Sequence, residues 1–375
     1  MPISTKPISL FGGSGFILSN YARLYPEGFV ELRECFCPKY NDVLYGISTV
    51  DNYHPLKGDF HVDINTNLNH LMDVLPNVEG SFTFLSSWFV LNRAPGRICH
   101  WPAPAMHFDE NDECWPKGMY AITKYCAERL IQTHCETVQA GLVKGSSSYR
   151  ILRLCNVIGN DPKAGKQKNA LEFLLRKIVN NEDVQIYEGD NFRNYLHVND
   201  VCRAIHLCLD KPETLNGITN IGAPESVRLI DLISYAIQKT GSKSQITRIP
   251  VPAFHKIVQV PDFFMNTNKL QSLGFIPEMD AYQAVDAVLA GILDAARYKA
   301  CIDEDISEAD TYQGLTLSDR ADMVKGHYCI MRQDPHHPAY VEYWTERGWA
   351  AFGEVFMSRE EAVAARRKIL ASVNP

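Results

Sequence analysis

The fold is decided near the N-terminus by residues 7–18, PISLFGGSGFIL. A short β-branched and aromatic run ends in glycines, and apolar residues then recur with helical spacing as far as Leu24. This order predicts a strand, a tight turn and a helix, the opening unit of a doubly wound parallel sheet. Gly12 and Gly15 would let a pyrophosphate approach the N-terminus of that helix, although glycine-rich turns are common. Leu18 stands where a third glycine would allow closer packing, so we expect a slightly wider helix–sheet spacing there.

The same alternation of strand and helix continues along the chain, which predicts a parallel sheet covered by helices on both faces. The expected strands are residues 29–33, 42–48, 81–87 and 149–154, and the expected helices are residues 65–75 and 119–138. After Asn156 the pattern is less regular, with helices at 170–180, 198–209 and 229–240 and strands at 184–187 and 218–221.

From Cys301 the composition changes again. An acidic stretch, residues 303–310, is interpreted as a linker, and short strand-like segments follow at 328–332, 339–345 and 349–357. A capping box at Ser358 predicts a last helix. We therefore expect an α/β protein with a sheet domain (residues 1–157 plus about 191–215), a smaller α/β domain (158–190 plus 216–300) and a small α+β extension (301–375) whose sequence indicates no chemistry.

Composition excludes several classes of protein. The chain has 375 residues, a net charge of −7 and no concentrated basic stretch, which argues against a nucleic-acid or anionic-membrane surface. Its apolar runs fall short of the ~20 residues that a membrane span needs. The eleven cysteines are scattered, and Cys35, Cys37 and Cys99 lack zinc-site spacing, so we expect reduced thiols, no metal site and a cytoplasmic location.

The residue types best suited to catalysis are Tyr120 and Lys124, which are four positions apart and so share one face of the expected helix. An ammonium close to a phenol lowers the phenol pKa and yields a general base usable near neutral pH. Ser86 and Ser87 end an earlier strand, where a hydroxyl could bind the same substrate hydroxyl. Taken alone, however, the Tyr–Lys pair also fits an ordinary amphipathic helix.

The order of these motifs, together with Arg153-Leu154-Cys155-Asn156 and the run Arg193–Asp200, resembles the extended short-chain dehydrogenase/reductases. More narrowly, residues 7–295 resemble the NAD-dependent sugar-nucleotide epimerase/dehydratase family. The resemblance implies a Rossmann-type cofactor domain, bound NAD and a nucleoside-diphosphate sugar as substrate. It also implies a homodimer that forms through the helices near 65–75 and 119–138.

The resemblance also implies a role for each matching position. Tyr120 would be the catalytic base, Lys124 would hold the nicotinamide ribose and tune Tyr120, and Ser87 would orient the sugar hydroxyl. Asn156 and Arg193 would bind the substrate, the arginine gripping its diphosphate. The implied cofactor-binding residues are Gly12, Ser14, Gly15, Phe16, Ile17, Arg33, Ser48, Thr49, Ser86 and Lys124.

Three departures from the family pattern matter. Trp88 and Phe89 stand where the 4,6-dehydratases of the family carry Asp-Glu, and aromatic rings cannot protonate a leaving hydroxyl. The segment between the second and third strands is shorter than is usual for the family and lacks a strand and the acidic residue that normally marks the adenine side. Glu31 or Glu34 there would favour NAD, whereas Arg33 would favour NADP, and the family resemblance favours NAD. The loop at 92–112 is long and is placed where a substrate lid could lie.

These observations favour an epimerase that oxidises a sugar hydroxyl, most simply at C4, and then reduces the ketose again from its other face. A net reductase or dehydrogenase of a nucleotide-linked keto-sugar would use the same residues. A dehydratase is disfavoured by Trp88 and Phe89. A non-catalytic protein that kept the scaffold is disfavoured because Tyr120, Lys124 and Ser87 are all present.

Overall fold

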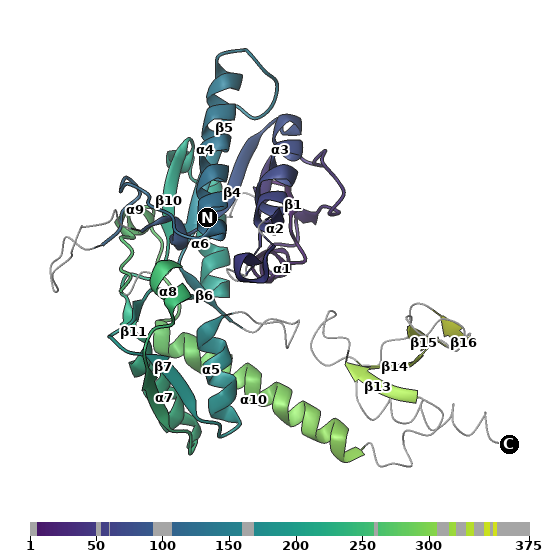
Figure 1. Ribbon diagram of the computed structural model, residues 1–375. Coiled ribbons are helices and arrows are strands. Elements are labelled where there is room, and N and C mark those ends of the chain that lie inside the picture. The colour runs from purple at the N-terminus through teal and green to yellow at the C-terminus, as the bar shows by residue number, and fades with distance from the viewer. Residues whose placement is uncertain are drawn as a thin grey trace. The chain divides into compact units, whose positions relative to one another are not determined.

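The computed structural model describes residues 6–49, 54–59, 61–92, 107–159, 169–258, 262–305, 315–319, 328–333, 341–345 and 348–350. The chain divides into two compact units, one of Met1–Asn160 with Gln167–Leu289 and one of Asp161–Lys166 with Ala290–Pro375. Each unit is described by itself, and the first contains all the residues implicated above (Figure 1).

A sheet of six parallel strands in the order β10-β5-β4-β3-β1-β2 forms the centre of the first unit. The strands are β1 Ile8–Phe11, β2 Gly28–Val30, β3 Val43–Tyr45, β4 Ser81–Ser87, β5 Ser148–Leu154 and β10 Gly217–Ile221. All residues of β1 and β3 are buried, as expected of strands covered on both faces. The predicted doubly wound parallel sheet is confirmed.

Alternate side chains of the strands pack into two separate hydrophobic cores. Leu10, Leu44 and Leu85 pack with α1 Phe16–Leu24 and α6 Val198–Asp210. Phe11, Tyr45 and their neighbours pack with α3 His70–Val74 and α4 Met119–Gln139. The period-two alternation of the strands therefore places one pair of helices on each face of the sheet.

The second strand differs from its prediction. Residues 29–33 were expected to be extended, but β2 ends at Val30, at the edge of the sheet. The buried Glu31 explains the early end, because its Oε1 accepts hydrogen bonds from Ser9 Oγ (2.7 Å) and from the amide of Lys39 (2.6 Å). These bonds turn the chain back toward β3, and residues 31–42, all described, form no helix or strand.

The rest of the first unit consists of small sheets and helices. β6 Asn156–Ile158 pairs with β9 Tyr195–His197, β8 Phe192–Arg193 with β11 Val227–Arg228, and β7 Val184–Tyr187 with β12 Ile246–Ile249. The helices are α5 Ala170–Val179, α7 Leu229–Thr240, α8 Ala253–Val258, α9 Asn268–Ser272 and the start of α10 Ala281–Asp305.

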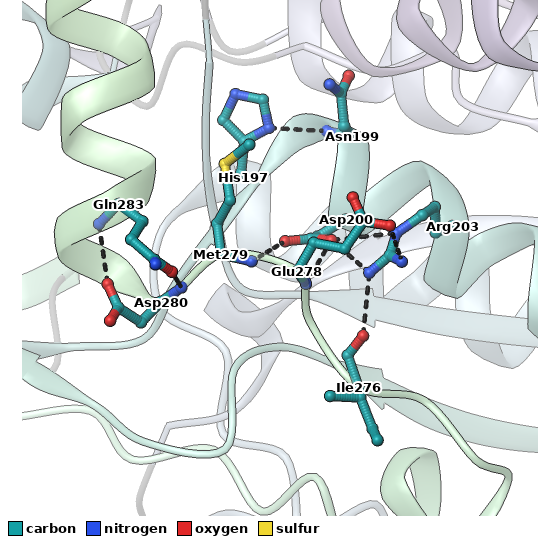
Figure 2. A network of polar contacts seen from close by, with 9 residues as sticks. All are labelled: His197, Asn199, Asp200, Arg203, Ile276, Glu278, Met279, Asp280 and Gln283. Atoms are coloured by element: carbon teal, nitrogen blue, oxygen red, sulfur yellow. Dashed lines mark hydrogen bonds and ion pairs between the residues drawn. The ribbon is translucent and has the colours of Figure 1, made fainter.

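Asp200, in the first turn of α6, joins this region to the sheet domain. Figure 2 shows its carboxylate accepting hydrogen bonds from Arg203 Nη2 (2.6 Å) and from the amides of Glu278 (3.0 Å) and Met279 (3.1 Å). Arg203 also donates to the carbonyl of Ile276 at 2.9 Å. The end of the Arg193–Asp200 motif is therefore a structural anchor for the segment that leads into α10.

The second unit contains a four-stranded antiparallel sheet in the order β13-β14-β15-β16, formed by Leu315–Asp319, Tyr328–Gln333, Val341–Thr345 and Gly348–Ala350. The linker prediction was wrong for its first residues, because α10 continues through Asp305. Its alanine-rich sequence favours that continuation. The expected helix after Ser358 lies outside the described residues. Across the described part of the chain, no helix combines the length and the apolar character needed to cross a bilayer.

Candidate active site

The glycine turn between β1 and α1 leaves no room for side chains. Gly12 has φ +92°, and a Cβ on it would lie 3.0 Å from the backbone of Gly46 and Ile47. The amide of Gly15 donates to the carbonyl of Gly12 at 2.8 Å, and Gly15 caps α1 without any side-chain hydrogen bond to the first turn. A turn of this shape beside a helix N-terminus without a side-chain cap fits the pyrophosphate of a dinucleotide. Ser14, Phe16 and Ile17, the other predicted contacts, lie in the same turn and first helical residues.

Leu18 is accommodated by a glycine on the opposite side of the contact. Its side chain is 2% exposed, and a Cβ on Gly46 would lie 2.8 Å from Leu18 Cδ1. The small residue that closer helix–strand packing requires is therefore on the strand side rather than in the helix. The prediction of a wider spacing did not take Gly46 into account.

Three hydroxyl groups meet at the carboxyl edge of the sheet. Ser87 ends β4, Ser48 follows β3, and Tyr120 lies in the first turn of α4. The hydroxyls of both serines lie near enough to the phenol of Tyr120 to lower its pKa as hydrogen-bonding partners, and Ser48 Oγ donates to the carbonyl of Thr49 at 2.7 Å. Ligands of open α/β sheets bind at this edge, so the cluster is where a substrate hydroxyl would be expected.

The electrostatics of Tyr120 differ from the expectation. Burial raises the pKa of its phenol, the hydrogen bonds to Ser87 and Ser48 act against that rise, and the negative charge of Asp63 adds to it. Lys124 was expected to lower this pKa, but its Nζ is directed to strand β4 and donates to the carbonyl of Leu85 at 2.7 Å. The shared helix face was predicted correctly, but the acceptor on the neighbouring strand decides where the ammonium lies.

Lys124 is itself strongly perturbed. Its side chain is buried, and its Nζ lies 4.5 Å from the centroid of the Phe84 ring. Burial lowers the pKa of Lys124 to about 7, while the charge of Glu128 acts in the opposite direction. A buried lysine whose pKa lies near neutral pH is typical of a functional site.

A buried ion pair between Glu128 and Arg153 lies one helical turn from Lys124 and was not predicted from the sequence. Glu128, one turn further along α4, accepts from Arg153 Nε (3.1 Å) and Nη2 (2.7 Å) and from Ser86 Oγ (2.5 Å). The Glu128 and Arg153 side chains are 1% and 2% exposed. Ser86 was predicted to bind the cofactor, but its hydroxyl is directed to Glu128. The i+4 spacing of Lys124 and Glu128 was the available signal for this network.

Aromatic rings lie beside the cluster of Tyr120, Ser87 and Ser48. The buried Trp88 lies 4.5 Å from Phe263 between ring centroids, and the ring of Phe89 meets that of Tyr120 edge-on at 5.8 Å. The guanidinium of Arg193 lies 5.8 Å from the Trp88 ring. The structure therefore brings Arg193 to the residue that follows Ser87, with aromatic groups rather than carboxylates at positions 88 and 89.

The other predicted substrate and adenosine contacts are more dispersed. Asn156 opens β6, and its amide group donates to the carbonyl of Asn194 at 3.2 Å. Arg33 is exposed beyond β2, and its carbonyl is 2.9 Å from Nε2 of His70. Since Glu31 is already buried in the loop that follows β2, Arg33 and Glu34 are left as the exposed charged residues of the predicted adenosine side.

A second buried polar network lies next to Tyr120. Thr49, predicted to line the cofactor, donates its amide to Asn67 Oδ1 at 2.8 Å and its hydroxyl to Asp63 Oδ1. Asn67 Nδ2 in turn donates to Thr123 Oγ1 at 2.8 Å. The sequence had placed a helix at 65–75, but α2 begins at His61 and a π-helical turn, Asn65–Asn69, connects it to α3. Asp63 was missed because it lay outside the expected helix.

Comparison with known proteins gives a consistent picture. Residues 58–222 match the NAD dependent epimerase/dehydratase family. A relative in Methanocaldococcus jannaschii, provisionally named a UDP-glucose 4-epimerase, is 24% identical over 184 residues, which are 48% of this chain and 55% of that protein. The low-salt glycan biosynthesis protein Agl12 of Haloferax volcanii is 23% identical over 311 residues, 74% of this chain and 95% of that protein. The match thus spans little more than half of the first relative and nearly all of the second.

Solved structures share the fold. UDP-glucose 4-epimerase of Thermotoga maritima, determined with UDP-glucose, superposes with a TM-score of 0.63 at 18% identity and covers 77% of this chain and 99% of its own. UDP-glucose 4-epimerase of Thermus thermophilus, in complex with NAD, gives a TM-score of 0.60 at 18% identity and the same coverage. At these identities the likeness concerns the fold alone.

Proposed function

Because residues 58–222 match the NAD dependent epimerase/dehydratase family, we propose that this protein is a sugar-nucleotide epimerase. The substrate would be a nucleoside-diphosphate hexose, and the cofactor would be NAD bound at the Gly12–Ile17 turn. In this proposal residues 1–157 with about 191–215 hold the cofactor, and residues 158–190 with 216–300 hold the sugar nucleotide.

The observation that carries the proposal is the cluster of Tyr120, Ser87 and Ser48 hydroxyls at the edge where the glycine turn lies. Ser87 Oγ orients the reacting sugar hydroxyl, and Tyr120 Oη takes its proton. Bound NAD supplies an acceptor that takes a hydride from the sugar carbon and can return it. The ketose then presents its other face, and Tyr120 gives the proton back. Arg193 and Asn156 hold the diphosphate and sugar.

Tyr120 can act as a base only if its phenolate is stabilised, because burial raises its pKa in the structure. We propose that Lys124 provides the positive charge, moving from the Leu85 carbonyl toward a bound ribose and the phenol. Its pKa of about 7 makes this charge dependent on pH near neutrality.

The raised pKa of Tyr120 also supports a second candidate function, that of a reductase. A phenol with a raised pKa is a good proton donor, which suits net reduction of a nucleotide-linked keto-sugar. An epimerase regenerates its cofactor in every turnover, whereas a reductase consumes reduced nicotinamide in proportion to product. Trp88 and Phe89 argue against a third possibility, 4,6-dehydration, because neither ring can transfer a proton to a leaving hydroxyl.

The test is to incubate the purified protein with UDP-hexoses, without added cofactor, and to separate the epimers by chromatography. We expect interconversion at C4 with no net change in the reduced-nicotinamide absorbance. Tyr120→Phe should abolish it, and Tyr125→Phe, on the same helix, should not. Full turnover by Tyr120→Phe would contradict the assigned base. In a parallel assay with a nucleotide-linked keto-sugar and added NADH, a loss of reduced-nicotinamide absorbance equal to the product formed would identify the reductase.

We also propose that the protein is a homodimer formed through the helices near 65–75 and 119–138. The proposal is supported by exposed apolar side chains on both helices, Met72, Ile122 and Leu130. Light scattering at micromolar concentration should give twice the chain mass, and Leu130→Glu should reduce it. A monomeric wild type would refute the dimer.

A further inference from the structure

A cavity of about 360 Å³ lies at the amino edge of the central sheet, within the first of the two units. Its lining includes the first residues of three strands, Ile8 of β1, Ser81 of β4 and Ser148 of β5. Ser87, by contrast, ends β4 at the carboxyl edge, where ligands of open α/β sheets bind. The volume falls in the range of about 300–1,000 Å³ that is usual for small-molecule sites. The cavity is therefore separate from the candidate active site and large enough for a small molecule.

Arg150 is the buried positive charge of this cavity, which it lines while being only 5% exposed. Its Nε donates to Thr214 Oγ1 (2.8 Å), Nη1 to Ser81 Oγ (3.1 Å) and Nη2 to the carbonyl of Leu209 (3.2 Å), all of them uncharged acceptors. A guanidinium has five N–H groups, so one hydrogen on Nη1 and one on Nη2 have no acceptor in the described part of the chain. Burial lowers the pKa of Arg150, and the charge of Asp42 opposes this effect without forming an ion pair. A buried charge in this state is stabilised by a counter-charge in direct contact.

Four carboxylates also line the cavity, those of Glu27, Asp42, Glu79 and Asp210. Oδ1 of Asp42 accepts from the amide and the hydroxyl of Ser81, each at 2.7 Å, and Oδ2 has no donor among the described residues. Glu27 and Glu79 form no hydrogen bond or ion pair within the same part of the chain. Asp210 lies 3.8 Å from Nε2 of His206, whose pKa is lowered by burial. None of the four carboxylates is therefore neutralised by a lysine or arginine in the described structure.

The arrangement of these charges indicates the class of ligand. In the lining, Lys6 and Arg150 carry positive charge against four carboxylates, of which those of Glu79 and Asp210 are exposed. A simple anion would reach Arg150 only past uncompensated carboxylates, and a simple cation would leave Arg150 without a counter-charge. A zwitterion avoids both costs, since its anionic group can meet the guanidinium while its ammonium meets carboxylates. The lining also contains apolar residues that suit an aliphatic substituent, namely Pro7, Ile8, Leu209 and Leu215.

We propose that this cavity binds a free α-amino acid with an aliphatic side chain. The carboxylate of the ligand accepts the two unused N–H hydrogens of Arg150, because a guanidinium matches a carboxylate in a bidentate pair. The ammonium of the ligand donates to Oδ2 of Asp42 and to the carboxylate of Glu79, which precedes β4. The inference does not depend on the proposed epimerase function, because no residue of the Tyr120 cluster or of the glycine turn lines this cavity.

Isothermal titration calorimetry on the full chain tests the two charges with three molecules that share a carbon skeleton: L-leucine, 4-methylpentanoate, which lacks the ammonium, and 3-methylbutylamine, which lacks the carboxylate. L-Leucine should bind, and each analogue should bind at least about 10-fold more weakly, because each loses a charged hydrogen-bonding group. Arg150→Lys should weaken L-leucine by a similar factor. Glu79→Gln removes an exposed carboxylate and should weaken L-leucine by about 2- to 5-fold. Glu182→Gln, exposed and outside the lining, is the matched control and should bind L-leucine as the wild type does.

L-Valine and L-isoleucine are titrated in the same way, and no binding of any of the three amino acids at millimolar concentration would overturn the inference. Equal affinity for L-leucine and either analogue would overturn it in favour of a site for a simple anion or a simple cation. Binding of D-glucose without binding of the amino acids would indicate a neutral polyhydroxyl ligand instead. Wild-type affinity in Glu79→Gln and in Arg150→Lys would show that L-leucine binds elsewhere. If Arg150→Lys does not fold, as judged by circular dichroism, the comparison of Glu79→Gln with Glu182→Gln decides.

Discussion

The buried pair between Glu128 and Arg153 gives the sharpest stability prediction. In the variant Glu128→Ala, the guanidinium of Arg153 loses two hydrogen bonds to the carboxylate, the one from Nε of 3.1 Å and the one from Nη2 of 2.7 Å. It keeps a 3.4 Å bond to the carbonyl of Glu110. The hydroxyl of Ser86 loses its acceptor at the same time.

The expected cost follows from burial. Both side chains are at most 2% exposed, so water cannot replace the lost partner. Removal of one member of such a pair costs about 3–5 kcal/mol, because a charge is left buried without compensation. Replacement of both members by apolar residues removes that charge, so Glu128→Leu combined with Arg153→Met should recover most of the loss.

Urea unfolding followed by circular dichroism measures the free energy of unfolding of each variant. Asp231→Ala is the control, since its pair with Arg228 is exposed and should contribute at most about 1 kcal/mol. A loss below about 1 kcal/mol for Glu128→Ala, equal to the control, would refute the reasoning from burial. So would a double variant less stable than Glu128→Ala.

Two further predictions concern Lys124 and Gly12. Since Lys124 has a pKa of about 7 when folded and 10.5 ordinarily, the unfolded chain binds the extra proton between these values, and stability from this site rises with pH across that window. The free energy of unfolding of wild type relative to Lys124→Met should therefore increase from pH 7 to pH 9, by up to about 1.4 kcal/mol per pH unit, and a decrease in urea unfolding would contradict it. Gly12→Ala should lose more stability than Gly58→Ala, because both have positive φ but a Cβ at Gly12 alone meets backbone, 3.0 Å from Gly46. Equal losses in the same assay would show that the close contact has no effect.

The local parts of the fold could be predicted because they depend on residues close in sequence. The strand, glycine turn and helix at 7–24 follow from apolar spacing and glycine placement, and the structure has them as β1 and α1. The pairing of Tyr120 with Ser87 could be expected because parallel strands and their following helices share one edge. In a parallel sheet the carboxyl ends of all strands lie at this one edge, so residues that follow different strands come close together there.

The direction of single side chains could not be predicted, because it depends on partners far along the chain. Lys124 shares a helix face with Tyr120, yet its ammonium is held by the carbonyl of Leu85, 39 residues away. Glu31 looked available to a ribose, yet Ser9 and the amide of Lys39 hold its carboxylate in the loop. Asp63 gave no sequence signal, since its burial depends on how α2 packs against α4.

The proposal of transient oxidation is tested most directly by the fate of deuterium placed at C4 of a nucleoside-diphosphate hexose. Purified protein with its bound cofactor should convert this substrate into its epimer with the deuterium still at C4, because the same hydride leaves and returns. Mass spectrometry of the product and of the solvent measures retention. Deuterium lost to water, or replaced by solvent hydrogen, would contradict the account, because the carbon would then have been deprotonated rather than oxidised.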